Sequence, residues 1–171
     1  HPLAVAEIVA EMGLDTDAIL GALLHDCIED TDTSHDDIAR LFGTTTAELV
    51  EGVTKLTRAN FSSTEQEQME NLRKMFMAMS KDIRVVLIKI ADRLHNMRTM
   101  QYQSPAKQIL KCRETMDIYA PLAHRLGMQK IKWELEDISL KYLEPQAYEE
   151  IMSYLNSRRE QDEAFMRSIQ E

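Results

Sequence analysis

Apolar residues recur along this chain at spacings of three and four, and no segment alternates apolar and polar positions as a strand would. This period predicts an all-α fold. The first helix is expected to begin at Pro2, which suits a first helical turn, and to stop near Gly13, which suits a helix end. A second helix is expected from Asp15 into the acidic stretch that ends at Asp30.

The same pattern continues to the end of the chain and predicts further helices joined by polar turns. Ser34 is a good N-cap for the next helix, and Pro105 marks a break. These helices are expected near residues 34–43, 45–56, 65–79, 83–100, 107–128 and 130–143 and from Gln146 onward.

The stretch LLHDCIED, residues 23–30, places unusual chemistry at the end of an apolar helix. On a continuous helix His25 would stack over Glu29, and Asp26 over Asp30. Helix C-termini favour cations, so this excess of carboxylates predicts a bound divalent cation. Imidazole and carboxylate ligands without thiolate suit manganese, iron, zinc or magnesium. The alternative is a solvated acidic helix end with a capping histidine.

A second polar cluster follows the apolar run VVLIKIA. Asn96 and Thr99 lie four and seven positions after Asp92, so one helix face presents a carboxylate, an amide and a hydroxyl. This order indicates a metal ligand followed by groups that contact a substrate. The alternative is an exposed polar face that closes a buried helix. His95 is either a partner of a metal ligand or a core histidine.

Composition narrows the class of protein. The net charge of −9 and the pI near 5.1 argue against a general basic surface for nucleic acid. Only two cysteines occur, Cys27 and Cys112, which favours a reducing cytoplasm over a disulfide framework. The apolar runs are too short for a membrane span. Because the chain starts at His1 without methionine, we expect it to be part of something longer.

Several long motifs resemble one known family. An initial histidine, the HD pair and a later aspartate in ADRLHN resemble the H…HD…D ligand order of the HD phosphohydrolase superfamily. The stretches HPLAVAEIVAEMGLD, ALLHDCIEDTD, ELVEGVTKL, NLRKMFMAMSKDIRVVLIKIADRLHNMRTM and ETMDIYAPLAHRLGMQKIKWELEDISLKYL resemble the N-terminal hydrolase half of bifunctional RelA/SpoT proteins, which make and destroy the alarmone (p)ppGpp.

The resemblance implies a helical HD-domain bundle with a C-terminal helical extension, divided here into residues 1–120 and 121–171. It implies that a synthetase domain follows in the full-length protein. It also implies a metal, usually Mn²⁺, hydrolysis at the 3′-pyrophosphate of (p)ppGpp, and no role in binding nucleic acid or membrane. The implied metal ligands are His1, His25, Asp26 and Asp92, the implied catalytic pair is Glu29 and Asp30, and the implied nucleotide contacts are Asn96 and Thr99.

Two other functions fit the same residues. The first is a phosphohydrolase of the same superfamily that acts on another nucleotide, for example by removing the 2′-phosphate of NADPH. The second is a non-catalytic helical module that senses the alarmone. The intact HD pair favours hydrolysis, because the monofunctional synthetase branch of the resembling family typically replaces it. Family members carry a basic residue and a turn before the first ligand, so part of the nucleotide pocket is expected upstream of His1.

Overall fold

The computed structural model describes residues 1–57, 73, 75 and 77–170, with side chains as far as residue 159. These residues are almost all helical, and no strand occurs among them. In the first half the helices are α1 Pro2–Glu11, α2 Thr16–Leu24, α3 Cys27–Asp30, α4 His35–Phe42 and α5 Thr44–Thr57. In the second half they are α7 Ile83–Arg98, η1 Met100–Tyr102, α8 Pro105–Glu114, η2 Thr115–Tyr119, α9 Ala120–Arg125, α10 Gln129–Leu143 and α11 Pro145–Gln170.

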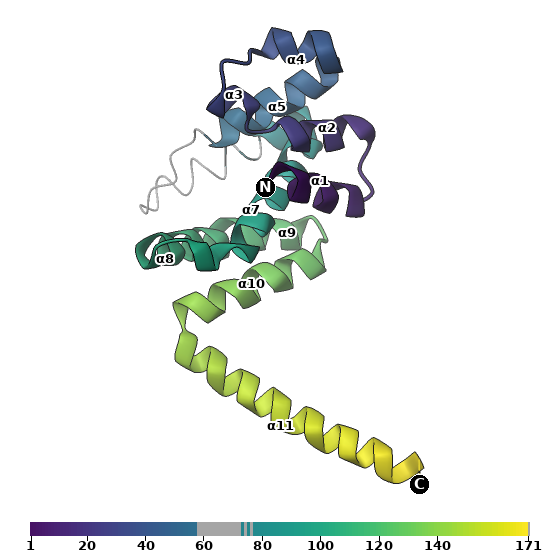
Figure 1. Cartoon of the computed structure of the whole chain (residues 1–171), viewed down its shortest axis with the longest axis vertical. Helices are drawn as coiled ribbons and strands as arrows, with labels where there is room; N and C mark the ends of the chain where they lie inside the picture. Colours follow the sequence, from purple (N-terminus) through teal and green to yellow (C-terminus); the bar gives the residue numbers. More distant parts are fainter. Residues whose placement is uncertain (58–72, 74, 76, 171) are drawn as a thin grey trace.

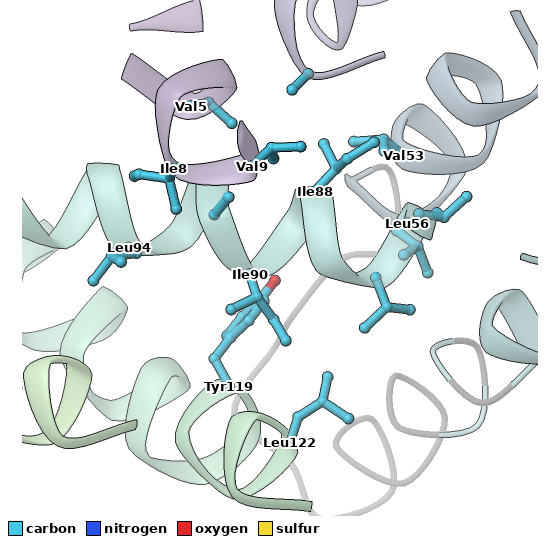
Figure 2. Packing of buried hydrophobic residues seen from close by; sticks show 14 of the residues in the cluster. Val5, Ile8, Val9, Val53, Leu56, Ile88, Ile90, Leu94, Tyr119 and Leu122 are labelled. Atoms are coloured by element: carbon cyan, nitrogen blue, oxygen red, sulfur yellow. The ribbon is translucent and has the colours of Figure 1, made fainter. Parts of the chain in front are cut away.

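Helix α7 runs through the centre of the bundle and contacts α1, α2, α5 and α10. Its apolar side chains point in several directions, and a helix that is apolar on more than one face has to be surrounded. Figure 2 shows Ile88, Ile90 and Leu94 of α7 between α1 and the segment that carries Tyr119. Polar residues in the middle of α7 are therefore held inside the bundle.

Three polar residues of α7 are buried in this way. Lys89, Asp92 and Arg93 are each less than a tenth exposed. The buried charge of Arg93 has partners nearby, because Nη2 lies 2.8 Å from Oε1 of Glu114 and the guanidinium lies 4.3 Å from the ring centroid of Tyr119. Lys89 and Asp92 belong to the site described below.

A smaller apolar cluster fixes the short helix α3. Ile38 of α4 and Val50 of α5 are buried together, and Cys27 and Ile28 of α3 pack against them. With this face of α3 against α4 and α5, its two carboxylates, Glu29 and Asp30, remain half-buried and exposed respectively. Both clusters thus place acidic residues at one edge of the bundle.

The expected helix boundaries agree well with the described part of the chain. Gly13 follows α1 with a φ of 76°, and Ser34 caps α4 in a reciprocal capping box with Asp37. Most of the helix expected over residues 65–79 lies outside the described residues; residues 77–81 are helical. Helix α11 leaves the bundle and projects away from it beyond α10 (Figure 1). Across the described residues, no helix is both long and apolar enough to cross a membrane.

One expected boundary was wrong. The second helix does not continue to Asp30, because α2 ends at Leu24 and Asp26 becomes the N-cap of α3. The His25 side chain turns back to the carbonyl of Ala22, while Cys27 and Ile28 follow the smaller apolar cluster. The contact of His25 lies on α2, whereas the contacts of Cys27 and Ile28 lie on α4 and α5, and the helix is interrupted between them. His25 therefore does not stack over Glu29 on one helix.

The start of α7 allows a prediction about stability. Asp82 caps α7 through a hydrogen bond from the Arg84 backbone and pairs with the Arg84 guanidinium at 2.6 Å. The hydrogen bond from the Arg84 side chain holds the pKa of Asp82 below its ordinary 3.8. Asp82→Ala is expected to lower the free energy of unfolding by about 1 kcal/mol at pH 7, measured by urea denaturation.

The sign of the pH dependence follows from the lowered pKa. An ionised Asp82 stabilises the fold fully above the unfolded pKa, and this stabilisation is lost as pH falls through the lower folded pKa. The difference between Asp82→Ala and the unsubstituted protein should therefore persist down to about pH 4 and shrink below it. An equal difference at pH 3 and pH 7 would show that the ion pair contributes nothing.

Candidate metal centre

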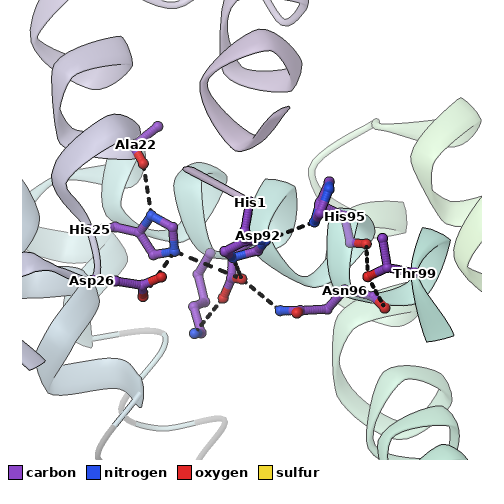
Figure 3. Close-up of polar contacts among 9 residues, drawn as sticks. His1, Ala22, His25, Asp26, Asp92, His95, Asn96 and Thr99 are labelled. Carbon is purple, nitrogen blue, oxygen red and sulfur yellow. Dashed lines mark hydrogen bonds and ion pairs between the residues drawn. The ribbon is translucent and has the colours of Figure 1, made fainter. Parts of the chain in front are cut away.

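Asp92 lies at the middle of the site and its two oxygens have different partners. Oδ2 accepts a hydrogen bond from Nζ of Lys89 at 2.7 Å. Oδ1 accepts one from the amide of Asn96 at 2.6 Å and lies 3.0 Å from Nε2 of His1 (Figure 3). Burial opposes the charge of Asp92, but the Lys89 ammonium outweighs this and holds the pKa of Asp92 below its usual range. The carboxylate is therefore ionised, and Oδ1 faces the histidines.

His25 presents a buried nitrogen without a hydrogen-bond donor. Its Nδ1 lies 2.7 Å from the carbonyl oxygen of Ala22, which can only accept, so Nδ1 carries the hydrogen in a neutral ring. Nε2 is then an acceptor, and it has no hydrogen-bond partner among the described residues. It lies 3.1 Å from Oδ1 of Asp26 and 3.9 Å from Oδ1 of Asp92. With the ring neutral, three electron-rich atoms face one another, an arrangement that a cation between them would stabilise.

His1 completes the group from the start of α1. Its Nε2 points at Asp92, and its Nδ1 lies 2.7 Å from Nδ1 of His95 (Figure 3). One ligand atom each from His1, His25 and Asp92 can be chosen so that all lie within 4.8 Å of one another. A hydrogen bond from the far nitrogen of each ligating histidine is the usual support of such sites. Here the carbonyl of Ala22 and the ring of His95 provide these contacts.

Asp26 lies beside this group but outside its most compact part. Its side chain is 41% exposed, and its contact with the site is the one to His25. Burial raises the pKa of Asp26, and the carboxylates of Asp92 and Asp30 raise it further. A cation held by these carboxylates would relieve the repulsion that these shifts report. The residues present therefore fit a divalent metal with imidazole and carboxylate ligands.

The remaining expected site residues lie close to this centre but differ in their contacts. Within the described residues, the side chains of Glu29 and Asp30 have no hydrogen-bond or ion-pair partner, and both residues lie on α3, which follows Asp26. Thr99 is the C-cap of α7, and its hydroxyl donates to the carbonyls of its own helix, that of His95 at 3.0 Å and that of Asn96 at 3.3 Å. The Asn96 amide is bound to Asp92.

The sequence reasoning missed one residue of the centre. The sequence analysis gives Lys89 no role in the site, yet its ammonium lies 2.7 Å from Oδ2 of Asp92. A signal was present, because a lysine inside an apolar run, three positions before an aspartate, is placed to pair with it on one helix face.

Comparison with known proteins gives this geometry its context. Residues 1–129 match the HD domain family. The chain belongs to the HD domain family. The all-α HD fold expected from the sequence is thereby confirmed. The similarity to RelA/SpoT hydrolase regions covers the whole chain, not only the residues that match the HD domain family.

Three relatives show the extent of that likeness. The chain is 53% identical over 171 residues to a Synechocystis protein named probable guanosine-3′,5′-bis(diphosphate) 3′-pyrophosphohydrolase, covering 100% of the chain and 22% of that protein. It is 52% identical over 159 residues to the bifunctional (p)ppGpp synthase/hydrolase SpoT of Escherichia coli, covering 93% and 23%. It is 53% identical over 158 residues to a GTP pyrophosphokinase of Streptomyces coelicolor, covering 92% and 18%. This HD domain chain thus spans about a fifth of each relative.

Proposed function

We propose that this HD domain hydrolyses (p)ppGpp at the 3′-pyrophosphate, with Mn²⁺ as cofactor, to give GDP or GTP and pyrophosphate. The observation that carries the proposal is the buried Nε2 of His25, which faces the carboxylates of Asp26 and Asp92 without a donor. The printed names of the relatives from Synechocystis and Escherichia coli support the substrate. Because other relatives are named for pyrophosphokinase activity, the names alone do not select hydrolysis, and the grouping of His1, His25 and Asp92 supports it.

The residues that would hold the metal are His1, His25, Asp26 and Asp92. When bound, the ion would lower the pKa of a ligated water and neutralise charge on the phosphoryl oxygens. Lys89 and Asn96 keep Asp92 ionised and oriented, and the carbonyl of Ala22 keeps Nε2 of His25 free to bind.

Glu29 and Asp30 would orient the attacking water and take its proton. Both carboxylates are available at the edge of the site, next to Asp26. As the water oxygen bonds to the phosphorus next to the ribose, the bond from this phosphorus to the 3′-oxygen would break. The proton released by the water would go to a carboxylate, and the leaving 3′-oxygen would take a proton, from that carboxylate or from solvent, to become the 3′-hydroxyl. A base placed in this way contributes about 100- to 10,000-fold in rate.

Asn96 and Thr99 would contact the nucleotide. The Asn96 amide nitrogen is used by Asp92, which leaves its carbonyl oxygen to accept from a base or ribose. The Thr99 hydroxyl donates to its own helix and keeps lone pairs for the same purpose.

The larger organisation is also a proposal. We assign residues 1–120 to the hydrolase core and residues 121–171 to an extension that leads toward a synthetase domain in the full-length protein. The projection of α11 away from the bundle supports the part of this extension from Pro145 onward, whereas α10 packs on α7. The length and printed name of the Escherichia coli relative support a synthetase domain in the longer protein. The unpaired cysteines, Cys27 and Cys112, support a reducing cytoplasmic setting.

Product analysis tests the proposed reaction. The purified protein is incubated with ppGpp and Mn²⁺, and the products are separated by anion-exchange chromatography and followed by phosphorus NMR. GDP and intact pyrophosphate are expected. Orthophosphate as the first product would reject cleavage at the 3′-ester. Release of phosphate from NADPH but not from ppGpp would indicate the other phosphohydrolase activity, and tight binding of ppGpp without turnover would indicate a sensor.

A further inference from the structure

Lys89 is the least expected residue of the centre. It is 7% exposed and lies within the apolar run of α7. A lysine is placed in such surroundings only when its charge has a partner. That partner is Asp92, with Nζ of Lys89 at 2.7 Å from Oδ2 and both side chains less than a tenth exposed.

The position of this cation relative to the proposed metal is informative. The Asp92 oxygens are divided, because Oδ1 faces His1 and His25 while Oδ2 is held by Lys89 on the other side. A carboxylate can bind a metal through one oxygen or through both. Oδ1 also accepts a hydrogen bond from Asn96, but its other lone pair is on the side of the histidines, whereas Oδ2 is directed away from them toward Lys89. Oδ1 is therefore the oxygen placed to bind the metal. A positive charge so close to a dication also weakens the binding of that dication.

We propose that Lys89 is a positioning residue that limits Asp92 to one metal-binding oxygen and thereby keeps a coordination position for water or a substrate oxygen. Catalytic metal sites need such an open position, whereas structural sites are closed. The inference rests on the proposed function, because an open position matters only where the site does chemistry. Lys89 thus lowers metal affinity in favour of turnover.

A purely structural role predicts the opposite sign. If Lys89 only supported Asp92 and the packing of α7, its removal would disorder the carboxylate, and metal affinity and turnover would fall together. If it restrains Asp92, removal frees Oδ2, and metal affinity rises while turnover falls.

The experiment compares Lys89→Met with the unsubstituted protein. Binding of Mn²⁺ is followed by the electron paramagnetic resonance signal of the free ion, and bound water by water-proton relaxation. Lys89→Met is expected to bind Mn²⁺ roughly 10- to 100-fold more tightly, the usual size of outer-shell effects on metal affinity, with fewer bound waters and a comparably lower kcat. Lys55→Met is the matched control, because Lys55 pairs with Glu51 at 2.9 Å on an exposed surface and should leave all three quantities unchanged.

Weaker Mn²⁺ binding in a folded Lys89→Met protein would overturn the proposal. If that variant does not fold, as judged by circular dichroism, Lys89→Gln takes its place, since it keeps a donor for Oδ2 without the charge. Because its amide still holds Oδ2 while the repelling charge is gone, Lys89→Gln should bind Mn²⁺ more tightly without losing bound water. Weaker binding or fewer bound waters in this variant would refute the role. If the unsubstituted protein binds Mn²⁺ but does not cleave ppGpp, the proposed function fails, while the metal-affinity comparison still tests Lys89.

Discussion

The Asp26→Ala variant is expected to lose metal binding and (p)ppGpp hydrolysis together. Asp26 faces Nε2 of His25 at 3.1 Å, and its carboxylate is the one in the centre that is substantially open to solvent. Removing an outer-shell partner of a metal ligand typically costs 10- to 100-fold in affinity, and we expect the loss of a ligand itself to cost at least about 100-fold. Isothermal titration with Mn²⁺ and product analysis at saturating ppGpp measure the two losses.

The fold should survive this substitution. The Asp26 side chain makes no capping hydrogen bond to α3, and its pKa is raised, which shows that ionised Asp26 is unfavourable in the metal-free protein. Asp36 provides a matched control. Its Oδ1 lies 3.3 Å from Nδ1 of His35 in a second His-Asp pair, but its side chain is 99% exposed. Asp36→Ala should bind metal and turn over normally. Retained Mn²⁺ affinity in Asp26→Ala would remove Asp26 from the ligand set.

Glu29→Gln is expected to keep the metal and lose turnover by about 100- to 10,000-fold, the usual contribution of a positioned base. The change preserves shape and removes only the ability to take a proton. The side chain of Glu29 has no hydrogen-bond or ion-pair partner within the described residues, so the substitution breaks no side-chain contact among them. Mn²⁺ titration and the kcat for ppGpp, measured on the same sample, separate binding from chemistry.

The neighbouring acid Asp32 gives the control, because it is exposed and lies just beyond α3. Asp32→Asn should have the kcat of the unsubstituted protein. Normal turnover of metal-bound Glu29→Gln would assign the proton transfer elsewhere, with Asp30 the next carboxylate to replace.

The two His-Asp pairs show what could and could not be predicted from the sequence. His25-Asp26 follows an apolar stretch of sequence, whereas His35-Asp36 lies in a polar one. In the structure the first pair is the more buried, since the side chains of His25 and Asp26 are 2% and 41% exposed and those of His35 and Asp36 are 35% and 99% exposed. The helical period and the capping residues likewise predicted most helices, because both are local properties of the chain.

Other features of the site depend on contacts between distant segments. Helix α2 ends at Leu24, and Cys27 and Ile28 pack against the cluster that contains Ile38. No local sequence pattern predicts this packing. The approach of His1 to Asp92 was expected only from the family resemblance. The pairing of Lys89 with Asp92 is local. It was not predicted, because the apolar residues on both sides of Lys89 give that segment the pattern of a buried apolar helix.

The ligand groups of the candidate centre come from the start of α1, the junction of α2 with α3, and the middle of α7. A bound ion would therefore act as a cross-link that closes two long loops of the chain. It would also stabilise the native state by mass action, by about 2.7 kcal/mol when the free metal is at 100 times its dissociation constant. The same ion that serves the chemistry would thus fasten the first residue of α1 to the central helix, so that catalysis and the folding of the N-terminal segment would depend on one metal concentration.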